Sequence, residues 1–171
     1  MTARAAVAIS GVPWEGRCVA GMRSPVRSGN VLGAETRLEV TDPAKRLLER
    51  AIAEGPSLPV AAARTCEELV AYLADFIGRS GARALFDRSL ALTVRDHPWL
   101  ADAVAGHDEP PWARLRSCLE AHADTALDAS VVLVAAMIGL FATFVGVGLT
   151  FRILHQHWPD VFPVDAPKEK P

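Results

Sequence analysis

The sequence ASVVLVAAMIGLFATFVGVGLTF, which spans Ala129 to Phe151, contains no charged residue. Asp128 precedes this run and Arg152 follows it, so the apolar stretch ends at a charge on both sides. A helix of this length extends about 35 Å, slightly more than the roughly 30 Å hydrocarbon core of a bilayer. The run therefore predicts one transmembrane helix over 129–151.

A helix buried in the core of a soluble bundle is the alternative interpretation of the same run. Because the run is apolar on all sides, a core helix of this sequence needs neighbours all round. The other helices expected in the chain are short and each offers a single apolar stripe, so this alternative favours a homodimer. Two locations stay open: a single-pass membrane protein whose bulk lies in the cytoplasm, or a soluble cytoplasmic dimer.

Small residues recur at spacings of three and four along the run. They are Ala135, Gly139, Ala142, Thr143, Gly146 and Thr150. A stripe of small side chains lets a second backbone approach closely, as in the small-xxx-small pairs that pack transmembrane helices together. The stripe predicts a helix-packing interface for another transmembrane helix, from a second copy or from a larger membrane complex. Gly146 and Gly148 also indicate a weak point, since glycine disfavours the helix.

The long helix is expected to occupy 125–158, with its first residue inside the helix at Ala126 and Thr125 as a cap. Pro159 would terminate it, since proline lacks the backbone N–H that a helix needs. Arg152 and Trp158 then lie where basic and aromatic side chains anchor a membrane helix at the interface. Residues 159–171 read as a polar tail.

Residues 41–124 show the periodicity of short amphipathic helices. Helices are expected from Pro43 to Glu54, from Thr65 to a break at Gly78–Gly81, from Ala82 to His97, and after Pro111. The side chains expected to face inward are Ala44, Leu47, Leu48, Ala51, Ile52, Leu69, Val70, Leu73, Phe76, Ile77, Leu85, Phe86, Leu90, Val94, Trp112, Leu115, Leu119 and His122. Residues 1–40 lack this periodicity and are expected to form a flexible or loop-rich arm. The fold class is all-α: a small bundle with one long C-terminal hydrophobic helix.

Composition excludes some classes of protein. The net charge is −2 and the chain has no basic patch, so nucleic-acid binding is not expected. Three cysteines without a CxxC pair argue against a disulfide framework and favour a reducing compartment.

The motifs that would indicate chemistry are weak. Cys118 and His122 are four residues apart, a spacing at which two side chains can share a metal, but two ligands do not make a site. The sequence Asp96–Trp99, Asp-His-Pro-Trp, is better explained as a helix end followed by a proline stop. No nucleophile elbow or phosphate loop occurs. We therefore expect no catalytic residue, cofactor or metal.

The sequence thus predicts a non-enzymatic, membrane-anchored interaction module or accessory subunit, with the lipid bilayer and another helix as partners. The alternative is a soluble, dimeric helical-bundle adaptor or regulator.

Overall fold

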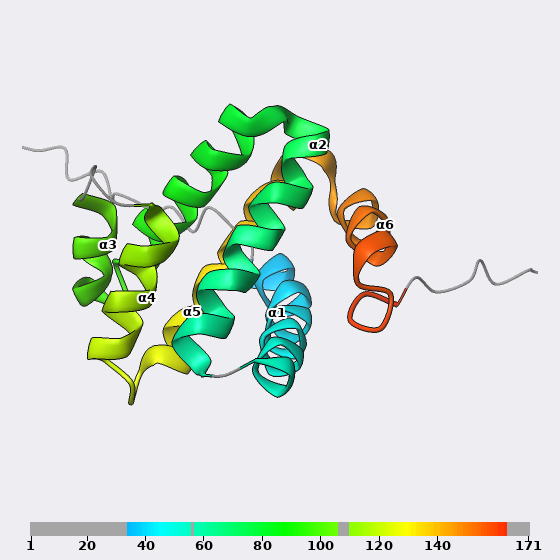
Figure 1. Cartoon of the computed structure of the whole chain (residues 1–171). Helices are drawn as coiled ribbons and strands as arrows, with labels where there is room; N and C mark the ends of the chain where they lie inside the picture. The colour runs from blue at the N-terminus through cyan, green and yellow to red at the C-terminus, as the bar shows by residue number, and fades with distance from the viewer. Residues whose placement is uncertain (1–33, 56, 106–109, 164–171) are drawn as a thin grey trace, which may run out of the picture.

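The computed structural model describes residues 34–55, 57–105 and 110–163, and all regular elements in these ranges are helical. They are α1 (Ala34–Glu54), α2 (Leu58–Thr93), the short 3-10 helix η1 (Pro98–Leu100), α3 (Ala101–Ala105), α4 (Pro111–Ala121), α5 (Ala126–Val145) and α6 (Val147–His157). Figure 1 shows their arrangement. The predicted all-α class is confirmed for this part of the chain. Most of the expected arm, residues 1–33, lies outside it.

Helix α5 lies at the centre of the bundle, where it packs against α1, α2 and α6 (Figure 1). Every residue from Leu133 to Ala142 is buried. The large side chains Leu133, Met137 and Phe141 are each at most 1% exposed and belong to one continuous core cluster. The bundle is therefore built around the most apolar helix of the chain.

Helix α2 bends at Gly78, so that its two halves diverge (Figure 1). The backbone of Gly78 has φ 75° and ψ 159°, a region that is open almost only to glycine. The first half of α2 carries Tyr72, which contacts α6, and the second half carries Phe86, whose ring packs on Trp112 of α4 at 4.8 Å. The predicted break is thus present at Gly78, while Gly81 is helical.

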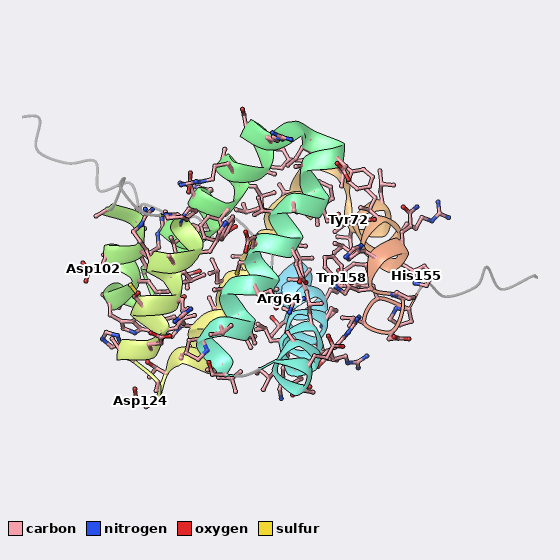
Figure 2. All side chains as sticks on the ribbon, viewed as in Figure 1. Arg64, Tyr72, Asp102, Asp124, His155 and Trp158 are labelled. Carbon is pink, nitrogen blue, oxygen red and sulfur yellow. The ribbon has the colours of Figure 1, made fainter. Side chains whose placement is uncertain are left out.

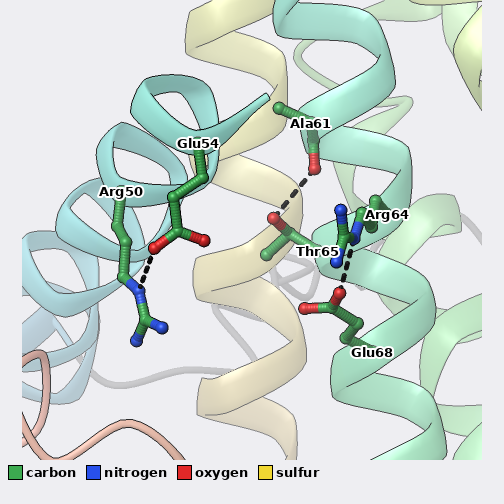
Figure 3. Close-up of polar contacts among 6 residues, drawn as sticks. All are labelled: Arg50, Glu54, Ala61, Arg64, Thr65 and Glu68. Carbon is green, nitrogen blue, oxygen red and sulfur yellow. Dashed lines mark hydrogen bonds and ion pairs between the residues drawn. The ribbon is translucent and has the colours of Figure 1, made fainter. Parts of the chain in front are cut away.

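Two helices begin earlier than the sequence suggested. Helix α1 begins at Ala34 and includes Pro43, which was expected to open it. Helix α2 begins at Leu58, and Thr65 lies inside it: the Thr65 hydroxyl donates a hydrogen bond to the carbonyl of Ala61 at 2.9 Å instead of capping a helix (Figure 3). The prediction that Thr65 begins this helix is therefore wrong.

The outer faces of α1 and α2 carry ion pairs within single helices. Arg50 pairs with Glu54 at 3.0 Å and Arg64 pairs with Glu68 at 2.7 Å (Figure 3). Exposed pairs at this spacing contribute only about 0.3–0.5 kcal/mol each. They mark the solvent side of the bundle, and the buried apolar side chains supply most of its stability.

The expected continuous helix over 125–158 is wrong. Helix α5 starts at Ala126 as predicted but ends at Val145, and α6 starts at Val147. Gly146 between them has φ 89° and ψ 148°, which no helix contains. Thr125 precedes α5 but makes no side-chain capping bond. The apolar run is consequently divided between two helices that point in different directions (Figure 1).

The expected polar tail also begins later than residue 159. Val161 and Phe162 are 4% and 2% exposed and belong to the core. The backbone N–H groups of both residues donate hydrogen bonds to the carbonyl of Trp158. Residues 164–171 lie outside the described part of the chain.

Candidate functional site

The six small residues of the stripe do not form one surface. Ala135, Gly139 and Ala142 are buried within α5, whereas Thr143 is exposed. Thr150 belongs to α6 and is completely buried, with its hydroxyl donating to the carbonyl of Gly146 at 2.9 Å. Four stripe residues are therefore buried, three in α5 and Thr150 in α6, whereas Thr143 and Gly146 are exposed. A role of the stripe in contacting another chain stays a prediction.

Gly146 acts through its backbone. A Cβ atom added there would meet no atom within 4 Å, so no neighbouring helix approaches this glycine closely. Its positive φ is what allows α5 to end and α6 to leave in a new direction. In the sequence, only the two nearby glycines, Gly146 and Gly148, indicated a turn at this position.

The two expected membrane anchors lie in different surroundings. Arg152 is exposed on α6. Trp158 is 4% exposed, and its ring lies 5.6 Å from the ring of Tyr72 in an edge-on arrangement. Figure 2 shows Tyr72 and Trp158 between the body of the bundle and α6. The Trp158 ring thus contacts protein in this fold, and anchoring by either residue stays a prediction.

Tyr72, which is the chain's single tyrosine, connects α2 with α6. Its hydroxyl donates a hydrogen bond to the carbonyl of Ile153 at 2.7 Å, and its ring lies 4.8 Å from that of His157. Burial raises the pKa of the Tyr72 phenol, and the negative charge of Asp75 raises it further. The phenol therefore keeps its proton and remains a donor. The spacing of apolar residues in the sequence predicts neither the hydrogen bond of Tyr72 nor Ile153 as its partner.

A second side-chain hydrogen bond holds the end of the described part of the chain. Nδ1 of His155 lies 2.7 Å from the carbonyl of Phe162, so this nitrogen carries the proton and donates it. Because Phe162 is buried, the bond fixes the turn after α6 against the core. His155 thus has a structural partner.

At the opposite end of α5, two histidines and a tryptophan gather around the start of the helix. Nε2 of His97 lies 3.4 Å from the carboxylate of Asp128. The rings of Trp99 and His122 are stacked, with centroids 4.4 Å apart and planes 11° apart. The His97 side chain is 10% exposed and that of Asp128 is 78% exposed. An exposed carboxylate next to one imidazole gives a weak pair, because water screens its charge.

Cys118 and His122 do not offer a shared ligand pair. Nδ1 of His122 donates to the backbone carbonyl of Cys118 at 3.1 Å. Burial and the charge of Asp102 raise the pKa of the Cys118 thiol, which disfavours the thiolate that binds metals. Across the described ranges, no three His, Cys, Asp or Glu side chains are grouped closely enough to hold a metal ion.

The remaining candidate is an exposed apolar surface where α2 bends and α5 ends. We call it the apolar tip and define it by Phe76, Phe144 and Leu149, which are 46%, 77% and 51% exposed. Phe76 was predicted to face inward, and that prediction is wrong. Large exposed apolar side chains that occur together are typical of interaction sites.

Contacts of Tyr72 and the turn at Gly146 together place the three residues of the apolar tip at the same end of the molecule. The Phe76 ring lies 5.4 Å from that of Tyr72, one turn closer to the bend of α2. Leu149 lies one turn before Ile153, which Tyr72 contacts, and Phe144 is separated from Leu149 by the turn at Gly146. In Figure 1 the bend of α2 and the α5–α6 connection are seen at the same end of the bundle.

Comparisons with protein-family models, curated proteins and solved structures find no match to this chain. Its function is therefore inferred from its own residues.

Proposed function

We propose that the protein is a non-enzymatic helical interaction module in which α5 is the core helix of the chain's own bundle. The observation that supports this is the burial of every residue from Leu133 to Ala142. Full burial of one large apolar side chain stabilises a fold by about 1.5–3 kcal/mol. A helix that left the bundle to cross a bilayer would expose the faces of α1 and α2 that cover it.

This proposal follows the soluble alternative of the sequence analysis, with one difference. The neighbours that a fully apolar helix requires are supplied by α1, α2 and α6 of the same chain, so a dimer is not needed to cover α5. The interaction surface is then the apolar tip, whose side chains the described part of the chain leaves exposed.

A single-pass membrane anchor is the second candidate function, and one observation favours it. Helix α5 has 20 residues, and its most apolar 18-residue segment has a mean hydropathy of 2.1, so the helix is long and apolar enough to cross a membrane. However, 67% of this segment is buried inside the bundle, as is typical of a core helix in a soluble protein. The first function requires α5 to stay inside the bundle, whereas the second requires it to leave the bundle and enter the bilayer.

High-speed centrifugation of the full-length protein without detergent tests the choice. We expect the protein to stay in the supernatant and to show cooperative unfolding with helical content intact. Recovery only in a membrane pellet that resists alkaline extraction would overturn the core-helix proposal and establish the anchor.

Replacement of Gly139 with leucine gives a second readout. Gly139 is buried, so a leucine there should overpack the core and lower the free energy of unfolding by roughly 1–3 kcal/mol. For a membrane helix the same change would instead abolish association with a partner while leaving the helical content unchanged. Unchanged unfolding together with a lost complex would contradict the core-helix proposal.

A further inference from the structure

The charges next to the apolar tip are mostly positive. Arg79 follows the bend of α2, and Arg152 follows the apolar part of α6; both are exposed. Within the described ranges neither arginine forms an ion pair. The nearest exposed acid on α2 is Asp75, and no Asp or Glu occurs between Asp128 and Asp160. The tip therefore combines exposed apolar side chains with two cations that are free to bind an anionic partner.

We propose that the apolar tip docks on the surface of an anionic lipid bilayer. Phe144 and Leu149 enter the headgroup region, while Arg79 and Arg152 contact lipid phosphates. The proposal rests on the core-helix function above, because this surface exists only while α5 stays in the bundle. It differs from a transmembrane anchor, since only the end of α5 and the start of α6 touch lipid.

The composition of the tip favours a lipid surface over a second copy of the chain. Two tips packed face to face would bring four arginines together against two copies of Asp75, which is electrostatically unfavourable. An anionic leaflet attracts basic residues near its surface, and aromatic and leucine side chains bury favourably at the boundary between headgroups and acyl chains. Gly146 and Gly148 carry no side chains that would hold the two apolar residues away from the bilayer.

Co-sedimentation of the full-length protein with vesicles tests the proposal. The probes are vesicles of phosphatidylcholine alone and of phosphatidylcholine with phosphatidylserine. We expect binding to the vesicles with phosphatidylserine and a decrease as salt is raised. The double variant Phe144→Gln/Leu149→Gln should weaken this binding about tenfold or more, because two apolar side chains no longer enter the bilayer. Leu127→Gln, on a leucine 44% exposed at the other end of α5, is the matched control and should bind as the wild type does.

A second double variant tests the charges independently. Arg79→Gln/Arg152→Gln should lower binding to the anionic vesicles by roughly tenfold and remove most of its salt dependence. Because both residues are exposed, the helical content should be unchanged. If the glutamine substitutions at the apolar positions impair folding, this variant and the salt dependence of the wild type still decide the matter.

Three results would overturn the lipid proposal. The first is that the wild-type protein stays in the supernatant with both vesicle types. The second is that the wild type and both double variants bind equally. The third is that the protein self-associates without binding vesicles and that Phe144→Gln/Leu149→Gln abolishes this self-association. The last result would assign the tip to a second copy of the chain. A wild-type protein that sediments without vesicles and needs detergent would instead contradict the core-helix function.

Discussion

The hydroxyl of Tyr72 on α2 and the carbonyl of Ile153 on α6 are joined by a hydrogen bond of 2.7 Å, although 81 positions separate the two residues in sequence. This bond and the surrounding aromatic rings attach α6 to the body of the bundle. Since α6 has only 11 residues, it depends on such contacts to keep its position.

Replacing Tyr72 with phenylalanine keeps the ring and removes the bond. We expect a loss of about 1 kcal/mol in the free energy of unfolding, the net contribution of one typical hydrogen bond. Amide hydrogen exchange should become faster in α6 and stay unchanged in the central turns of α5. Equal exchange rates in wild type and variant throughout α6 would show that the ring contacts alone position this helix.

Gly146→Ala tests the turn between α5 and α6. The backbone there has φ 89° and ψ 148°, which strains any residue with a Cβ, so the variant should lose about 1–3 kcal/mol in urea unfolding. Gly148→Ala is the control: it is also an exposed glycine near the tip, but it lies inside α6 and a Cβ added there meets nothing within 4 Å. Alanine favours helix over glycine by up to about 1 kcal/mol, so the control should be neutral or stabilised. Equal destabilisation of both variants would argue against strain at Gly146.

Phe141 and Phe144 form a matched pair on α5. Phe141 is fully buried and Phe144 is 77% exposed. In a soluble bundle, Phe141→Ala should cost about 3–5 kcal/mol of stability, because it removes a large side chain from the core. Phe144→Ala should change stability by no more than about 0.5 kcal/mol. Similar losses for both phenylalanines in thermal unfolding would indicate that the exposed ring is covered by something in solution.

Cys66 should be unreactive in the folded protein. It is 1% exposed, and burial raises the pKa of its thiol from 9.0 to about 12. In a background with Cys18→Ser, a thiol reagent at neutral pH should modify the half-buried Cys118 first and Cys66 only on unfolding. Modification of Cys66 at the rate of Cys118 in the native protein would contradict this burial.

The same thiol gives a pH dependence with a defined sign. The folded state holds the proton more tightly than the unfolded state, so the contribution of Cys66 to stability is complete below pH 9 and is lost as pH rises from about 9 to about 12. Cys66→Ala lacks this titration. The difference in unfolding free energy between wild type and variant should therefore shrink over that interval, and a constant difference would be inconsistent with a raised pKa.

The sequence predicted buried residues correctly in several helices that have one apolar and one polar side. Leu69, Leu73, Leu115 and Leu119 are buried as their spacing predicted. Phe76 follows the same spacing but is exposed, because α2 changes direction two residues later at Gly78 and the described part of the chain leaves nearly half of its side chain uncovered. The spacing of apolar residues predicts which side chains share a helix face. Whether another helix covers that face of α2 depends on the bend at Gly78, which the spacing does not predict.

The apolar run itself was ambiguous for a physical reason. A helix surrounded by lipid and a helix surrounded by other helices both exclude charge on all sides, so 129–151 fits either environment. The turn at Gly146 depends on a backbone conformation that composition only suggests. The apolar tip could not be predicted from the sequence either, since Phe144 and Phe141 both lie in the apolar run and differ only in what packs against them.

The place of α5 in the chain has a consequence for biosynthesis. Helices α1 to α4 precede Ala126, so they leave the ribosome before the helix that covers their apolar faces has been made. Until α5 emerges, α1 and α2 lack the helix that packs against both of them in the finished bundle. The bundle therefore cannot be completed until Val145, the last residue of α5, has been synthesised, and apolar surface of α1 and α2 stays exposed until then. A chain terminated before that point would be a substrate for chaperones and proteases.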